Sequence, residues 1–231
     1  MNDFFWFAVF PYVAVAIELV LSFYRYFTNS YKFSSLSSGF LEGKTLFWGS
    51  VPWHFGILTI LLGHLIGFLF PRHILLFNGS PLRFAILEVT ALVGGLFALF
   101  GLVVLIYRRF TNGRVSAVTS KSDVLVLFLL LTQVVSGLGI ALSYRWGSSW
   151  YAASLVPYLK SVFVFAPDLT YISSLPPLVK WHVFNAVLLV AVLPFTRLIH
   201  FLVLPIHYIW RSWQVVRWNW NPKTIRKRNI R

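Results

Sequence analysis

Four histidines lie inside two long apolar stretches of the sequence, His54 and His64 in one and His182 and His200 in the other. Ionisable side chains are costly inside a membrane and are usually kept there for a function. Each imidazole has a ring nitrogen that can bind a metal ion. A hydrogen bond to a neighbour would explain a single histidine of this kind. Two pairs on two helices favour a metal-binding role instead.

The spacing of the histidines suits two haem groups held between antiparallel helices. His64 lies about 15 Å beyond His54, and His200 about 27 Å beyond His182, at a rise of ~1.5 Å per residue. A separation of 18 residues is about five helical turns, so His182 and His200 should face the same side. Pairing by depth joins His54 with His200 and His64 with His182, and each pair can supply two axial nitrogens to one b-type haem. A bend at Pro194 would absorb part of the unequal spacing.

Three glycines flank the histidines of the first stretch: Gly56, Gly63 and Gly67. Glycine lets a flat macrocycle approach the backbone. Small residues are equally suited to helix–helix packing in membranes. Both roles stay open for these positions, and they do not exclude each other.

The composition excludes a soluble globular protein. Of the 231 residues, 58% are hydrophobic and only 11% are charged, whereas soluble domains carry about 25% charged residues. The absence of cysteine excludes disulfides, thiolate zinc sites, cysteine-held iron–sulfur clusters and covalently attached haem. The formal charge of +14 is typical of nucleic-acid binding, but the basic residues cluster at the edges of apolar runs. We therefore expect no nucleic-acid partner.

Five apolar runs are long enough to cross about 30 Å of hydrocarbon as helices. We predict an all-α membrane bundle with five transmembrane helices in a single membrane domain. The predicted spans, followed by the basic C-terminal tail, are residues 4–24, 52–70, 84–107, 124–143 and 179–205, and then 206–231. Pro52 would lie in the first turn of its helix, where its missing N–H costs little.

The stretch 144–178 is the remaining apolar region. It contains Pro157 and Lys160 and is too short in its apolar middle to span comfortably. We expect it to lie at the membrane interface, rather than to form a sixth span.

The distribution of Lys and Arg predicts an outside N-terminus and a cytoplasmic C-terminus. The loops after the first and third runs, together with the tail, carry fourteen of these residues, and the opposite side carries five. Cytoplasmic loops are the positively charged ones. The sequence therefore predicts a multi-pass protein of the inner or plasma membrane, in contact with lipid.

Several segments resemble one known family, the gamma subunit of respiratory nitrate reductase. WHFGILTILLGHLIG (53–67) carries the first two histidines, and PFTRLIHF (194–201) carries the last. Pro11–Tyr12, YRRFTNGRVSAVTSKSD (107–123) and VVRWN in the tail extend the resemblance over nearly the whole chain. In this family the subunit is a dihaem cytochrome b that anchors the enzyme to the membrane.

The resemblance implies a function and a ligand set. His54 and His200 would bind the inner haem, and His64 and His182 the outer haem. The subunit would oxidise quinol and pass electrons through the outer and then the inner haem b to an iron–sulfur subunit. A molybdenum catalytic subunit of the same complex would receive them next.

Further site residues follow from the expected path of quinol. Oxidation near the outer haem would release protons outside, and Gly63 and Glu88 lie near that level. A partly buried carboxylate can accept a proton from quinol; alternatively, Glu88 stabilises the positive N-terminal end of the third helix. Arginine grips carboxylates bidentately, so Arg197, Arg109 and Arg114 are predicted contacts of haem propionates, although topology alone would explain the last two.

Two alternatives remain. Related cytochromes b serve reductases of sulfur compounds and heterodisulfides, so the complex could have another terminal acceptor. A small proton-linked transporter would also use intramembrane histidines and carboxylates, but the sequence has no inverted repeat to support it.

Overall fold

The computed structural model describes residues 3–28 and 38–203, and every regular element within these ranges is a helix. Five helical segments are long and apolar enough to cross a membrane, which confirms the predicted all-α, multi-pass architecture. They are formed by η1 (Phe5–Val9) with α1 (Phe10–Thr28), α2 (Lys44–Leu69), α4 (Pro81–Thr111), α6 (Lys121–Ser143), and α10 (Pro177–Val192) with η4 (Leu193–Phe195).

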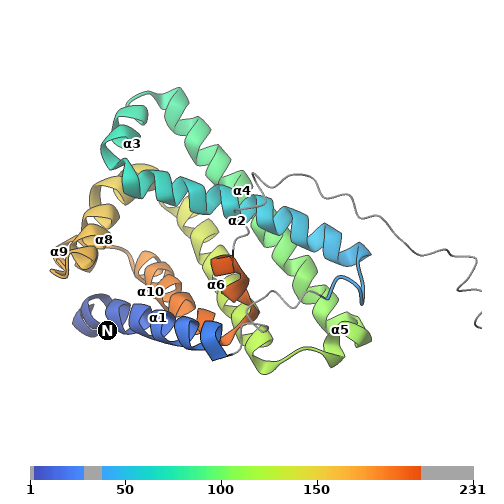
Figure 1. The fold of residues 1–231 in the computed structure, drawn as a ribbon. Helices are drawn as coiled ribbons and strands as arrows, with labels where there is room; N and C mark the ends of the chain where they lie inside the picture. The colour runs from blue at the N-terminus through green and yellow to red at the C-terminus, as the bar shows by residue number, and fades with distance from the viewer. Residues whose placement is uncertain (1–2, 29–37, 204–231) are drawn as a thin grey trace, which may run out of the picture.

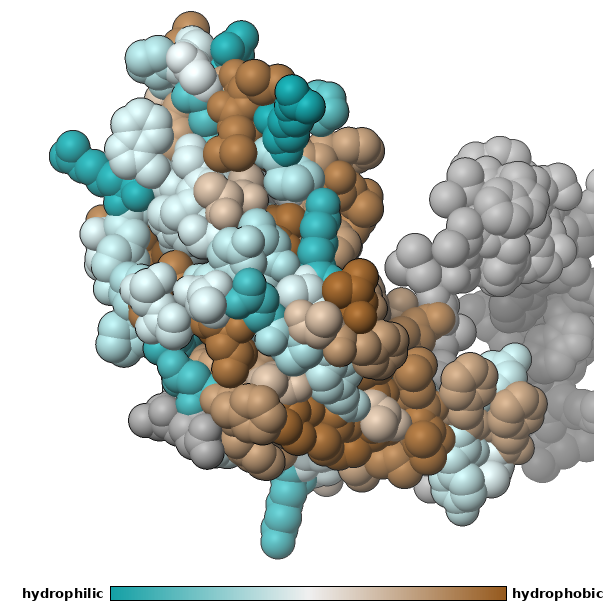
Figure 2. Space-filling view, turned by 90° about the vertical axis from the view of Figure 1, so that its left-hand side faces the viewer, coloured by the Kyte–Doolittle hydropathy of each residue, from teal (hydrophilic) through white to brown (hydrophobic). Residues whose placement is uncertain are grey.

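Short helices connect or follow the long ones (Figure 1). They are α3 (Pro71–Phe77), α5 (Gly113–Ala117), α7 (Gly147–Trp150), η3 (Tyr151–Leu155), α8 (Val156–Phe163), α9 (Thr170–Ser173) and η5 (Arg197–Val203). In Figure 1, α3, α8 and α9 lie on the left, and α5 lies at the opposite end. Following the predicted orientation, we call these the outer and the inner end. Figure 2 faces the outer end, where hydrophilic and weakly polar side chains gather beside the brown surface of the spans.

The long helices pack in a row. The most extensive contact joins α2 to α4, after which α4 packs on α6, α6 on α10 and α10 on α1. α2 and α10 share no comparably extensive contact. The helices that carry His54 and His64 on one side and His182 on the other are therefore held in place by other helices and not by each other.

Glycines bring α2 and α4 into backbone contact. A Cβ atom added at Gly56 would lie 2.4 Å from the amide nitrogen of Ala98, and one added at Gly101 would lie 2.4 Å from that of Trp53. Small residues at an interface allow membrane helices to approach this closely. Gly56 is thus a helix-packing residue, one of its two predicted roles. The buried core beside this contact consists of Trp53, Ala98, Leu102, Val134 and Leu138.

α2 begins about two turns earlier than predicted. It starts at Lys44, so Pro52 lies inside the helix and not in its first turn, which corrects its predicted place. The cause is a contact at the inner end of the bundle. The Glu42 carboxylate accepts a hydrogen bond from the Thr45 amide at 2.7 Å and pairs with buried Arg108 of α4 at 2.6 Å. These two contacts lower the pKa of Glu42 to about 2, so it stays ionised at the start of the helix.

The fifth span is not a continuous helix. α10 ends at Val192, Pro194 lies in a 3-10 turn, and Thr196 is extended, with φ −119° and ψ 176°. The bend expected at Pro194 is therefore present. The argument that placed His182 and His200 on one helix face does not hold, because it assumed an unbroken helix. The predicted basic tail lies outside the described residues.

The segment 144–178 folds over the outer end. Its helices α7, η3, α8 and α9 are all too short to span, which confirms five spans rather than six. Tyr158 is 1% exposed and donates its hydroxyl to the Phe7 carbonyl at 2.8 Å; burial raises the pKa of Tyr158, so this hydroxyl stays a donor. Tyr12 donates to the Val162 carbonyl at 2.9 Å. These bonds hold the segment against the first span.

We expect Gly101→Val to destabilise the contact between α2 and α4. The new Cβ would lie 2.4 Å from the Trp53 nitrogen and 2.5 Å from the Gly49 oxygen, and backbone atoms cannot rotate aside. Overpacking costs about 1–3 kcal/mol, and the upper part of this range applies because a whole helix must shift. Thermal unfolding in detergent should occur at a lower temperature.

Gly113→Ala is the control for this measurement, because a Cβ at Gly113 has nothing within 4 Å. Equal unfolding temperatures for the two variants would contradict the packing role of Gly101.

Candidate functional site

Three of the four intramembrane histidines present the same ring nitrogen. The Nδ1-to-carbonyl distances are 2.7 Å for His54 to Ser50, 2.8 Å for His64 to Ile60 and 2.7 Å for His200 to Arg197. A carbonyl can only accept, so Nδ1 carries the proton and Nε2 keeps its lone pair. Among the described residues, none of these three Nε2 atoms has a hydrogen-bond partner. This is the tautomer that binds a metal through Nε2.

His64 and His182 lie close enough to interact electrostatically, although α2 and α10 share no extensive contact. His64 is exposed and His182 is half-buried. The structure thus brings one predicted pair together, on two helices held apart by their own neighbours. A planar group bound between the two helices would cover the exposed His64 imidazole, whose Nε2 lipid alone would leave unsatisfied.

The other predicted pair lies further toward the inner end. His54 is exposed on α2 and His200 is half-buried on η5. No hydrogen bond joins these two rings in the part of the chain that the structure describes. The same part contains no group of three His, Cys, Asp or Glu side chains that could hold a bare metal ion. Pairs of histidines suit haem iron, which needs only two axial ligands from the protein.

His182 differs from the other three histidines in its partners. Its Nδ1 lies 2.9 Å from the hydroxyl of Ser136, and its Nε2 lies 3.1 Å from the amide nitrogen of Gln133, both on α6. The Gln133 oxygen accepts a hydrogen bond from Asn185 at 2.7 Å. Neither Ser136 nor Gln133 is marked by the sequence, because an isolated polar residue in an apolar run has no characteristic spacing.

The surroundings of His64 include a residue that sequence reasoning missed. Tyr151 of η3 donates its hydroxyl to the His64 carbonyl at 2.9 Å, and the two rings meet edge to face at 5.2 Å. Burial raises the pKa of Tyr151 to about 12, so this hydroxyl remains a donor. A Cβ at Gly67 would lie 2.8 Å from the Tyr151 ring, whereas one at Gly63 would have nothing within 4 Å. Gly63 alone of the three flanking glycines leaves open space.

Glu88 is bound to the segment that folds over the outer end. Its carboxylate accepts the backbone N–H of Ser148 at 3.0 Å and the Ser148 hydroxyl at 2.7 Å. α4 begins at Pro81, seven residues earlier, and the helix dipole acts only within the first turn. The alternative role of Glu88, stabilisation of the helix N-terminus, is therefore wrong. Asn78 donates to the same Ser148 hydroxyl at 3.0 Å, and its own carbonyl oxygen is buried without a partner among the described residues.

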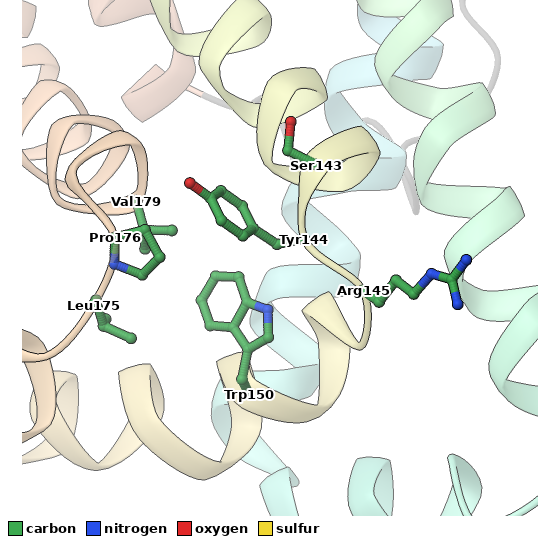
Figure 3. Close-up of a pocket in the computed structure, with 7 residues that line it drawn as sticks. All are labelled: Ser143, Tyr144, Arg145, Trp150, Leu175, Pro176 and Val179. Atoms are coloured by element: carbon green, nitrogen blue, oxygen red, sulfur yellow. The ribbon is translucent and has the colours of Figure 1, made fainter.

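A pocket of about 260 Å³ opens between the outer ends of α6 and α10. It is lined by Ser143, Tyr144, Arg145, Trp150, Leu175, Pro176 and Val179. The rings of Tyr144 and Trp150 lie toward the apolar residues of the opposite wall, and the Arg145 side chain points away (Figure 3). Val179 precedes His182 by three residues on α10, so the pocket lies about one helical turn outside this histidine. Apolar and aromatic linings of this kind bind the rings of small amphiphiles.

One buried carboxylate organises the inner end. Asp123 is 3% exposed and pairs with Arg109 at 3.2 Å and with Arg197 at 3.0 Å. Two of the three predicted propionate contacts are thus brought together, and they share a protein carboxylate. The exposed Arg114 side chain forms no hydrogen bond or ion pair with the described residues. Asp123 also ties the segment that carries His200 to α4 and α6.

The chain is similar to nitrate reductase gamma subunits over nearly its whole length. The model of the family described as nitrate reductase gamma subunit matches residues 3–219. The nitrate reductase gamma chain of Bacillus subtilis (strain 168) is 32% identical over 90% of this chain and 95% of that relative. The respiratory nitrate reductase 1 gamma chain of Escherichia coli (strain K12) is 31% identical over 92% and 96%. The nitrate reductase-like protein NarX of Mycobacterium tuberculosis (strain ATCC 25618 / H37Rv) is 33% identical over 94% of this chain but only 34% of that protein. The five apolar spans and this near-complete match show that the chain belongs to the nitrate reductase gamma subunit family.

Proposed function

We propose that this chain is the dihaem cytochrome b subunit of a nitrate reductase complex, in which it oxidises membrane quinol and delivers the electrons to an iron–sulfur subunit. A molybdenum catalytic subunit of the same complex would then receive them. Family membership supports a membrane subunit of such an oxidoreductase complex. The observation that carries the finer proposal is the proximity of His64 and His182 on two helices that share no extensive contact.

The histidine chemistry fits haem at both levels. His64 with His182 would hold an outer haem, and His54 with His200 an inner one. Each Nδ1 has a partner that leaves Nε2 as the basic nitrogen, as metal-binding histidines require. When bound, each haem would carry one electron at a time across the membrane.

The arginines at the inner end are proposed propionate contacts. Arg197 and Arg109, which both pair with Asp123, would bind propionates from this cluster. The side chain of Arg114 is exposed, and its whole guanidinium group would be able to bind a propionate. Arginine is suited to this task because its planar guanidinium matches a carboxylate in two places.

We place quinol oxidation at the outer end, with Glu88 as the proton acceptor and Gly63 beside the ring. Glu88 and the buried oxygen of Asn78 are both acceptors, connected through the Ser148 hydroxyl, and a quinol hydroxyl is a donor. A proton accepted here leaves on the outer side of the membrane. The open space at Gly63 lies next to His64.

The ligand assignment predicts which haem each variant loses. His54→Ala or His200→Ala should remove the inner haem, and His64→Ala or His182→Ala the outer haem, because each iron loses an axial nitrogen. Haem content and a redox titration of the b-type bands would measure this in the purified complex. His73→Gln, on exposed α3, should retain both haems. Loss of the same haem in the His54 and His182 variants would show that the pairing is wrong.

The proton-acceptor role of Glu88 predicts a selective kinetic defect. Glu88→Gln should slow quinol-driven haem reduction by roughly 10²-fold or more, as for other general bases, while dithionite reduction and haem content stay normal. Ser148→Ala is the matched variant, because it removes a hydrogen bond to Glu88 and leaves the carboxylate. Equal rates in these two variants would mean that Glu88 only holds the segment at the outer end.

If the iron–sulfur subunit docks at the inner end, only residues at that end should cross-link to it. A photo-reactive amino acid at Lys121, exposed at the inner end, should cross-link to the iron–sulfur subunit in the assembled complex. The same group at Arg72, exposed on α3 at the outer end, should not. Cross-links from position 72 alone would reverse the proposed docking face.

A further inference from the structure

A chain of hydrogen bonds between α6 and α10 surrounds His182. Ser136 and Gln133 approach the two ring nitrogens at 2.9 and 3.1 Å. Asn185, which is 0% exposed, follows His182 by one turn and donates to the Gln133 side-chain oxygen at 2.7 Å. Buried polar networks of this kind rigidify their members when every group is satisfied.

The direction of each bond follows from the donors and acceptors. The Asn185 amide nitrogen donates to the Leu129 carbonyl at 3.0 Å, which sets the orientation of that amide. Its second hydrogen goes to the Gln133 side-chain oxygen, so the Gln133 nitrogen must point its hydrogens at His182. The Ser136 hydroxyl donates to the Gln133 main-chain carbonyl at 3.0 Å. The Ser136 oxygen is therefore an acceptor toward the ring.

These directions allow one tautomer of His182. Nδ1 must carry the proton, because it faces the acceptor oxygen of Ser136. Nε2 must carry the lone pair, because it faces an amide donor of Gln133. The opposite tautomer would set two donors against each other at Nε2 and leave Nδ1 without a donor. His54, His64 and His200 obtain the same tautomer from a carbonyl of their own helical segment, whereas His182 obtains it from side chains.

We propose that Ser136, Gln133 and Asn185 are positioning residues of the outer haem: together they fix the tautomer and the orientation of the His182 ring that receives the haem, and the Ser136 hydrogen bond sets the reduction potential of that haem separately from the inner one. This inference rests on the proposed function, because it takes His182 as a ligand. Coordination to iron is much stronger than the amide contact, so the Gln133 nitrogen gives up its bond when haem binds. The Nδ1 hydrogen bond to Ser136 persists and raises the basicity of the ligand.

A more basic imidazole favours the ferric state over the ferrous state. Removing the acceptor at Ser136 should therefore raise the midpoint potential of the outer haem. A tenfold change in the relative affinity of the two oxidation states corresponds to ~59 mV for one electron, and we expect a change of about this size. The inner haem, bound by His54 and His200, should keep its potential.

The experiment is a redox titration of the intact complex. Ser136→Ala removes the hydroxyl, Ser136→Thr keeps one at the same position, and Asn185→Leu removes the donor that orients Gln133. The His64→Ala variant identifies which spectral component belongs to the outer haem. Thr90→Val is the matched control, because it removes a hydroxyl that bonds only its own helix at Ile86, on an exposed face of α4.

The expected result is a raised outer midpoint in Ser136→Ala and a lower content of the outer haem alone in Asn185→Leu. Ser136→Thr and Thr90→Val should match the parent complex. An unchanged outer midpoint in Ser136→Ala, unchanged haem content in Asn185→Leu, or equal effects on both haems would overturn the inference. Absence of b-type bands from the parent complex would instead overturn the proposed function, so the two failures are distinguishable.

Discussion

Hydrocarbon offers no hydrogen bonds, so the polar groups within the five spans must find their partners inside the protein. Helices solve this for the backbone, and the same solution extends to side chains. The hydroxyls of Thr59 and Thr90 bond the carbonyl one turn earlier, and three of the four histidines do the same through Nδ1. Because Nδ1 donates its proton to a main-chain carbonyl, Nε2 keeps its lone pair and remains basic. The requirement to satisfy polar groups in lipid thus leaves imidazoles whose Nε2 is available to a metal ion.

The positions of these imidazoles depend on helices that carry no ligand. α2 is held by backbone contact with α4 at Gly56 and Gly101, which keeps His54 and His64 on one straight, supported helix. α10 is held by α6 and α1. The two histidine helices can face each other without packing on each other because each has a neighbour that bears the contact. A flat cofactor between them would need this separation.

The two levels of the site are organised by different chemistry. At the outer level, neutral side chains of α6 hold His182, and Tyr151 contacts His64. At the inner level, the break at Pro194 separates the segment with His200 from α10, and the ion pairs of Asp123 hold that segment. Hydrogen bonds at one level and buried ion pairs at the other allow the two proposed haems to differ in potential while the chain keeps a simple bundle.

The sequence by itself determined the class of fold and the residues able to do the chemistry. Run length and hydropathy define five spans, because the thickness of a bilayer leaves little freedom in helix length. Histidines in such runs stand out because an ionisable group is expensive there. Pro194 predicted a bend, but the helix start at Lys44 and the extent of the break after Val192 were not predictable in the same way. The first depends on an ion pair between Glu42 and Arg108, 66 residues apart, and the second on how the chain resumes after Pro194.

Only the tertiary structure decided which polar residues meet. In the sequence, Gln133, Ser136 and Asn185 are isolated polar residues within apolar runs. In the structure, the packing of α6 against α10 brings them together around His182. In the sequence, Tyr151 is one of several aromatic residues expected at the membrane interface. In the structure, η3 lies against α2 and the Tyr151 hydroxyl bonds the His64 carbonyl. A hydrogen bond needs a donor and an acceptor within about 3 Å, and that distance between separate helices is set by packing. Residue type and periodicity mark the proposed ligands; the contacts that orient them are a property of the folded chain.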